Sequence, residues 1–244
     1  MNLDEFKEFI KGKSVILVGN SVIGLNEEKG DYIDSFDVVV RFGKGLPIKG
    51  SDKYIGTRTD VWATGELRMG LHHRVPSEAQ IIFTPSTLKS SLEPSWSQMP
   101  FTKHLLAYTR PEIDRLSKEY NLPSDRRLSN GCIVSLWFAN VVTDWKSLTW
   151  VNFDAFKNSF IFYSNKIGQN TSAASWHLPV LRPEFAKQSL ETGCPSHCSA
   201  TETRIYKDIL KKENTYWKGG DLEAEHTFVE AARVAWTKER SASK

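Results

Sequence analysis

Two short apolar runs near the N-terminus, separated by a polar stretch, constrain the fold of this chain most strongly. Residues 14–18 read SVILV and residues 37–42 read DVVVRF, and both are rich in β-branched side chains. Nearly continuous apolar runs of this kind are typical of parallel strands that are covered on both faces. The first run ends in the small polar turn Gly19-Asn20-Ser21, and open α/β sheets bind phosphorylated ligands beyond such strand ends. We therefore expect an α/β protein that handles a nucleotide or a nucleotide-sugar.

Strand patterns alternate with helix patterns along the rest of the chain, which indicates α/β layers. The fold class that this order predicts is a Rossmann-like α/β/α sandwich with a mostly parallel sheet. A polar, Ser- and Pro-rich segment at 84–101 and the Gly- and Lys-rich segment at 43–58 are expected to be loops. Further strands are expected at residues 60–64, 80–83 and 148–153, and helices at 4–10, 110–120, 132–142, 201–212 and 221–238.

Length and composition limit the class of protein. With 244 residues, a single domain is the simplest expectation, with a nucleotide-binding core at about 13–155 and a lid and acceptor-side segment at about 163–244. The N-terminus lacks the apolar region of a signal peptide, and no apolar run is long enough to span a membrane. Three cysteines do not make a disulfide framework, so we expect a cytoplasmic, reducing location and no membrane partner. The net charge of +3 permits a polyanionic partner without requiring one.

The turn after the first strand leaves several interpretations open. Residues 19–24 resemble the dinucleotide fingerprint G-x-G-x-x-G, but Ser21 replaces the central glycine that lets the backbone approach a pyrophosphate. Arg41 near the end of the second strand would suit a 2′-phosphate, so an NADP-dependent enzyme stays possible. The nucleophile motif G-x-S-x-G fails because Gly24 lies one residue too far from Ser21. A structural turn without a ligand is the remaining alternative.

Three blocks in order along the chain resemble the motifs of glycosyltransferase family 29, the sialyltransferases. The stretch 15–62 resembles the large sialyl motif, the turn at Ser129 with the strand at 148–153 resembles the small motif, and His197 with Glu202 has the H-x4-E spacing of the last short motif. The pieces that match the large motif are Val18-Gly19-Asn20-Ser21, Ile33-Asp34-Ser35-Phe36-Asp37, Val40-Arg41 and Ile55-Gly56-Thr57-Arg58-Thr59-Asp60.

The resemblance implies a GT-A-variant, sialyltransferase-like fold and metal-independent transfer with a cytidine-monophosphate leaving group. Two departures qualify it. Gly43 stands where the family has an asparagine, and Val15 and Val142 lie near positions that form a disulfide in eukaryotic members. A chain without those cysteines agrees with a soluble bacterial or phage member of the family.

Glycosyl transfer needs a base for the acceptor hydroxyl, stabilisation of the leaving phosphate and a nucleotide pocket. His197 is the best candidate base because imidazole titrates near neutrality, and direct attack with one base implies inversion. Glu202 would orient His197 or cap its own helix, and His177 would add a hydrogen bond to the leaving group. The sequence contains no Asp-x-Asp metal motif, so we expect no metal and no cofactor besides the donor, a nucleotide-sugar linked to CMP or UDP. A zinc site around His197, Cys194 and Cys198 remains a weak alternative because no fourth ligand with typical spacing is evident. The expected nucleotide-binding residues are Gly19, Asn20, Ser21, Arg41, Ser129, Asn130, Gly131 and Asp154.

The acceptor is less constrained than the donor. The best guess is 5-hydroxymethylated cytosine in phage DNA, because a basic chain without an anchor suits a DNA-modifying enzyme and cationic side chains neutralise phosphates. Two alternatives stay open: a CMP-sialic acid-dependent sialyltransferase acting on a glycan or lipo-oligosaccharide, and an inactive nucleotide- or nucleic-acid-binding module. The nucleic-acid candidates are Arg126, Arg127, Lys207, Lys211 and Lys212.

Overall fold

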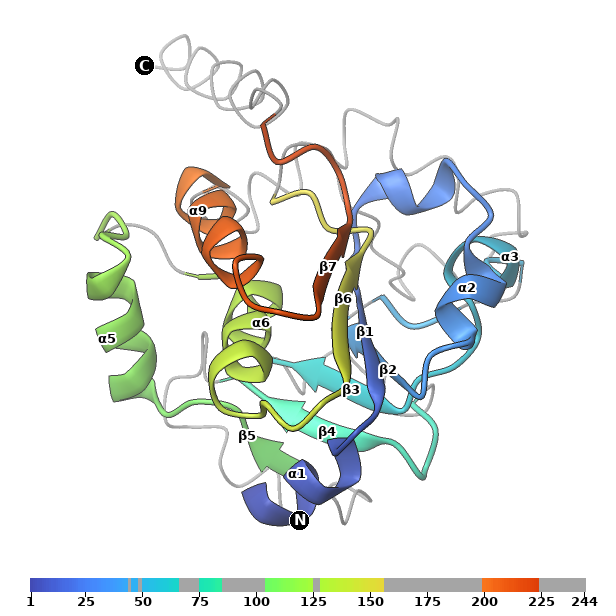
Figure 1. The fold of residues 1–244 in the computed structure, drawn as a ribbon, viewed down its shortest axis with the longest axis horizontal. Helices are drawn as coiled ribbons and strands as arrows, with labels where there is room; N and C mark the ends of the chain where they lie inside the picture. The colour runs from blue at the N-terminus through green and yellow to red at the C-terminus, as the bar shows by residue number, and fades with distance from the viewer. Residues whose placement is uncertain are drawn as a thin grey trace, which may run out of the picture.

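The structure is a computed structural model that describes residues 1–43, 45–47, 50–65, 75–84, 104–124, 128–155 and 199–223. Its centre is a seven-stranded sheet in which every neighbouring pair runs parallel (Figure 1). In chain order the strands are β1 (Ser14–Val18), β2 (Val38–Phe42), β3 (Val61–Thr64), β4 (Gln80–Phe83), β5 (His104–Leu106), β6 (Ser147–Val151) and β7 (Thr215–Lys218).

Helices cover both faces of the sheet (Figure 1). On one face lie α1, α5, α6 and α9, and on the other lie α2 and α3 with the short 3-10 helix η1. Their bounds are α1 (Leu3–Ile10), η1 (Val22–Leu25), α2 (Gly30–Asp34), α3 (Asp52–Ile55), α5 (Arg110–Glu119), α6 (Asn130–Asn140) and α9 (Ser199–Ile209). The Rossmann-like α/β/α class expected from the sequence is therefore confirmed, with a sheet that is wholly parallel among the described strands.

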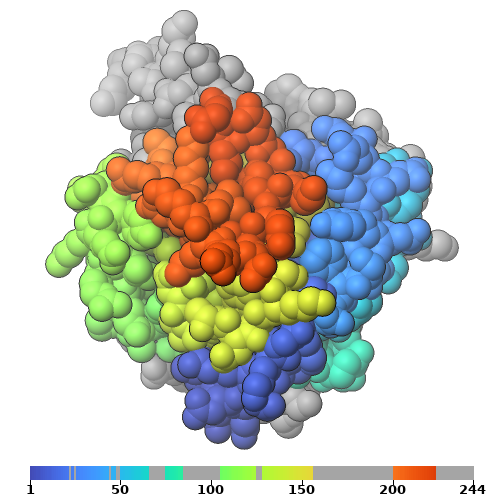
Figure 2. All heavy atoms as spheres, in the orientation of Figure 1, coloured from blue at the N-terminus to red at the C-terminus, as the bar shows by residue number. Residues whose placement is uncertain are grey.

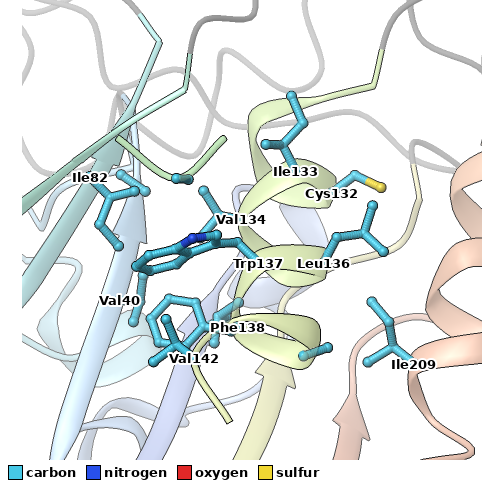
Figure 3. Packing of buried hydrophobic residues seen from close by; sticks show 14 of the residues in the cluster. Val40, Ile82, Cys132, Ile133, Val134, Leu136, Trp137, Phe138, Val142 and Ile209 are labelled. Atoms are coloured by element: carbon cyan, nitrogen blue, oxygen red, sulfur yellow. The ribbon is translucent and has the colours of Figure 1, made fainter. Parts of the chain in front are cut away.

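Helix α6 is the centre of the main core. It is apolar all round, as expected for a helix enclosed on every side, and its residues from Cys132 to Ala139 are buried. Figure 3 shows Trp137 of α6 directed toward Val40 and Ile82 of the sheet, while Leu136 lies on the side of Ile209 in α9. The N-terminal end of α6 is thereby fixed relative to both the sheet and α9.

The strand order places a topological switch point between β1 and β6. The order is β5-β4-β3-β2-β1-β6-β7, so the chain builds outward from β1 in one direction and then returns to its other side. Val18 pairs with Val151 at the ends of these two strands. The turn after β1 and the segment after β6 therefore emerge side by side, in the crevice where open α/β sheets bind their ligands.

Two pieces of the stretch that resembles the large sialyl motif brace the fold. Asp34 at the end of α2 accepts hydrogen bonds from Thr57 N at 2.8 Å, Thr57 Oγ1 at 2.9 Å and Arg58 N at 3.1 Å. The guanidinium of Arg58 donates in return to the carbonyl oxygens of Asp34, Phe36 and Asp37 and to the carboxylate of Asp60. Asp37 accepts from Ser14 N at 2.8 Å and Ser14 Oγ at 2.7 Å. These residues hold the entries to β1, β2 and β3 together.

Several boundaries differ from the sequence prediction. The predicted loop at 43–58 contains the single helical turn of α3, and β5, β7, η1 and α2 were not expected. The predicted helix at 221–238 has only residues 221–223 within the described part, and these are not helical. Among the described helices, none is both long and apolar enough to cross a bilayer.

Candidate ligand-binding site at the switch point

The turn after β1 is fastened to the segment after β6. Gly19 N donates to Val151 O at 2.8 Å and Ser21 N donates to Asn152 O at 3.1 Å. Ser21 Oγ, which is buried, donates to Asp154 Oδ2 at 2.6 Å. A Cβ atom on Gly19 would lie 2.4 Å from Asn152 O, so only glycine allows this approach. The structure brings Gly19, Ser21 and Asp154 together, and their contact with a nucleotide stays a prediction.

Asn20 reaches across to the neighbouring strand. Its Nδ2 donates to Phe42 O, the last residue of β2, at 3.1 Å. Gly45 packs directly against the same amide, because a Cβ atom there would lie 1.8 Å from Asn20 Oδ1. Asn20 therefore fixes the loop after β2 beside the turn after β1.

Arg41 is buried inside the protein. Its exposed fraction is 0%, and its Nε and Nη2 donate to Arg58 O and Ile55 O, each at 2.6 Å. A guanidinium that is enclosed in this way braces the loop before β3. The NADP interpretation, which needed Arg41 at an accessible strand end, loses its supporting residue.

Glu202 on α9 caps α6 from outside. Its Oε1 accepts from Ser129 N at 2.7 Å and its Oε2 accepts from Ser129 Oγ at 2.9 Å. Ser129 is also the N-cap of α6, since its Oγ accepts from Cys132 N at 3.1 Å. Burial raises the pKa of Glu202 to about 7, although the hydrogen bonds from Ser129 act in the opposite direction. The sequence suggested that Glu202 caps its own helix, whereas its carboxylate binds Ser129, the N-cap residue of α6.

Phe153 forms an apolar support beneath the site. A Cβ atom on Gly19 would lie 2.7 Å from its Cδ2, and one on Gly131 would lie 2.9 Å from its Cε1. The ring of Phe153 packs against those of Phe42, Tyr206 and Trp217, with centroid separations of 5.4, 5.8 and 6.3 Å. The Phe153 ring therefore sets the distance between the turn after β1 and the N-terminus of α6.

The N-terminus of α6 also reaches the end of β4. Thr84 Oγ1, just beyond that strand, donates to Asn130 Oδ1 at 2.8 Å, and Thr84 is fully buried. Ser129, Asn130 and Gly131 thus lie at the same sheet edge as the Gly19 turn, and their contact with a nucleotide stays a prediction.

Sequence reasoning missed Asn152 and Phe153 as site residues. The signal was available, because both directly follow a buried strand in the way that the Gly19 turn follows β1.

The remaining predicted residues divide into two groups. His177, His197, Arg126 and Arg127 lie outside the described residues. Within the described part, Lys207 Nζ lies 2.5 Å from Glu223 Oε1 and Lys211 Nζ lies 2.7 Å from Asp208 Oδ1. Figure 2 shows the segment 199–223, in orange and red, at the surface over residues 128–155. Two of the three lysines proposed for DNA therefore already have acidic partners.

The described part of the chain gives no evidence for a metal site. The described ranges contain no group of three or more His, Cys, Asp or Glu side chains placed to hold a metal ion. The zinc alternative, which rested on residues 194–198, lies outside these ranges.

Comparison with solved structures identifies the fold. A mammalian sialyltransferase in complex with Gal-beta-1-3GalNAc-ortho-nitrophenol superimposes with a TM-score of 0.54 and 16% identity, covering 88% of this chain and 72% of the other. The sialyltransferase CST-II in complex with CMP gives a TM-score of 0.53 and 14% identity, covering 84% and 80%. The chain has the sialyltransferase fold.

The comparisons of sequence found no relative, so the fold assignment rests on the solved structures alone. Neither a family model nor a curated protein matches the chain. The sialyltransferase-like chain therefore shares its architecture with these enzymes at an identity low enough that its activity has to be argued from the site.

Proposed function

We propose that this sialyltransferase-like chain transfers a sialic acid from CMP-sialic acid to a hydroxyl group of a glycan. The observation that carries the proposal is the junction at the switch point, where the turn after β1 is joined to the segment after β6 through Ser21 and Asp154. This is the crevice in which parallel α/β sheets bind nucleotides. The sialyl-motif resemblance and the CMP complex of a neighbour with this fold support cytidine as the base.

The proposed chemistry is an inverting displacement that uses the protein's own groups. His197 takes the proton of the acceptor hydroxyl as its oxygen attacks the anomeric carbon, and the bond to the CMP phosphate breaks as the new bond forms. The N-terminal dipole of α6 stabilises the leaving phosphate. Glu202 acts as a positioning residue, because it anchors α9, which begins two residues after His197, to Ser129.

A glycan acceptor is better supported than DNA. One neighbour with this fold was solved with a galactose-containing disaccharide derivative, whereas the lysines invoked for DNA include two in ion pairs. We therefore place the sialyltransferase alternative above the DNA interpretation that the basic composition first favoured.

Two measurements test the proposal. In a thermal-shift panel of CMP, CDP, UMP, UDP and NADPH, we expect stabilisation by the cytidine nucleotides and none by NADPH. With CMP-sialic acid as donor, CMP release should depend on a galactose-terminated glycan and should not depend on duplex DNA containing 5-hydroxymethylcytosine. Stabilisation by NADPH alone, or CMP release driven by that DNA, would overturn the proposed function.

A further inference from the structure

Asn152 has a side chain that is costly to bury where it stands. It follows β6 at the switch point and is 1% exposed. Neither its Nδ2 nor its Oδ1 has a hydrogen-bond partner anywhere in the described part of the chain. Its backbone φ of 59° lies in the left-handed region, which non-glycine residues seldom occupy although Asn tolerates it better than most. Buried amides are nearly always paired, so this one calls for a reason.

The neighbouring helix leaves space for this amide. A Cβ atom on Gly24 would lie 2.6 Å from Asn152 Nδ2 and 2.7 Å from its Cγ. Gly24 belongs to η1, a single 3-10 turn closed by bonds such as Gly24 N to Ser21 O at 3.1 Å. Gly24, which has no side chain, therefore lies directly against the carboxamide in the helix that follows the Gly19 turn. Because Asn152 is buried, a ligand would reach its amide by a shift of η1 at this residue.

We propose that the carboxamide of Asn152 recognises the nucleoside part of the donor, an inference that rests on the proposed function. An amide offers donors at Nδ2 and an acceptor at Oδ1. A phosphate dianion offers only acceptors and would leave Oδ1 unpaired. A cytosine edge with its amino group and ring nitrogen, or a pair of ribose hydroxyls, offers both a donor and an acceptor. The ligand group that pairs with Asn152 is therefore neutral and offers both a hydrogen-bond donor and an acceptor.

The test compares Asn152→Gly with the wild-type chain in titrations with cytidine, CMP, 2′-deoxy-CMP and inorganic phosphate. Glycine accepts the left-handed φ and removes the carboxamide together with its Cβ methylene. We expect affinities for cytidine and CMP to fall about tenfold or more, since an unpaired ligand group is left behind, with phosphate unchanged. Asn121→Gly is the matched control, because Asn121 has a φ of 49° and is exposed at the end of α5. It should bind every ligand as the wild type does.

Each result decides the inference. If wild-type discrimination between CMP and 2′-deoxy-CMP disappears in Asn152→Gly, the partner is the ribose; an equal loss for both ligands assigns the base. Unchanged CMP affinity, as expected if the amide only holds a buried water, overturns the inference, and so does an equal loss of phosphate. Should Asn152→Gly fail to fold, Asn152→Asp at pH 8 removes the donor at constant shape, and wild-type CMP affinity in that variant overturns the inference equally. A wild-type chain that binds no nucleotide refutes the proposed function itself, which is a different outcome.

Discussion

Ser21 and Asp154 lie 133 residues apart in the chain and are joined by a buried hydrogen bond of 2.6 Å. The bond links the two halves of the sheet at the point where the strand order reverses. It is a side-chain bond that adds to the backbone bonds from Gly19 N and Ser21 N between the same two segments, so its loss should reduce both stability and ligand binding.

Ser21→Ala should lower the free energy of unfolding by about 1–3 kcal/mol, because Asp154 loses a buried donor, and should weaken CMP binding. Urea denaturation and a CMP titration measure the two effects. Ser35→Ala is the control, since Ser35 Oγ donates only to Tyr32 O in an exposed turn. A Ser21→Ala protein that is no less stable than Ser35→Ala would show that the linkage contributes nothing.

Glu202 should make stability depend on pH near neutrality. Its pKa rises from an ordinary 4.5 to about 7 on folding because of burial, so the folded state holds the proton more tightly than the unfolded state. The contribution is fully present below about pH 4.5 and is lost as pH rises through about 7, by roughly 3 kcal/mol in all. Glu202→Gln cannot titrate, so its denaturation midpoint should change less than the wild type's between pH 5 and pH 8. Parallel profiles for the two proteins would contradict this assignment.

Gly19→Ala should disrupt the site by steric conflict alone. Its Cβ would lie 2.4 Å from Asn152 O, a backbone atom that is held by the hydrogen bond from Ser21 N. We expect a loss of more than about 2 kcal/mol, comparable to overpacking in a core, together with loss of CMP binding. Gly12→Ala is the comparison, because nothing lies within 4 Å of that position and only its φ of 69° opposes the change; about 1 kcal/mol is expected there. Equal losses in the two variants would exclude the steric explanation.

Arg58→Lys should destabilise the fold without altering the site. Lysine keeps the charge but cannot replace the planar fork that reaches three carbonyl groups and Asp60. The expected loss is about 2 kcal/mol, measured by urea denaturation, with CMP affinity retained in the folded protein. Arg110→Lys should change stability far less, because its pair with Asp114 is exposed. A retained midpoint in Arg58→Lys would mean that the carbonyl contacts are dispensable.

His197→Ala should abolish transfer and leave CMP affinity nearly intact, if His197 is the base of the proposed reaction. Initial rates with CMP-sialic acid and a glycan acceptor measure transfer, and calorimetry measures the affinity for CMP. His104→Gln, in the edge strand β5, serves as the control and should keep its turnover. Retained turnover in His197→Ala would exclude that residue as the base.

The central strands were predictable because they are local patterns. Runs such as SVILV and VVVRF are β-branched and buried on both faces, so their sequence alone indicates their environment. The two edge strands were not, since β5 has three residues and β7 alternates between half-buried and exposed positions. Edge strands depend on the neighbour that they pair with, and no local window contains that neighbour.

The sequence by itself determined the fold class, the turn after β1 and the cap at Ser129, because each follows from short-range propensity and hydrogen bonding within a few residues. Tertiary structure decided the rest. It enclosed Arg41 in the fold, turned Glu202 toward Ser129 on another helix, and placed Asn152 and Asp154 against the Gly19 turn. These contacts join residues separated by 14 to 133 positions, and the order of strands in the sheet, not any local preference, brings such residues together.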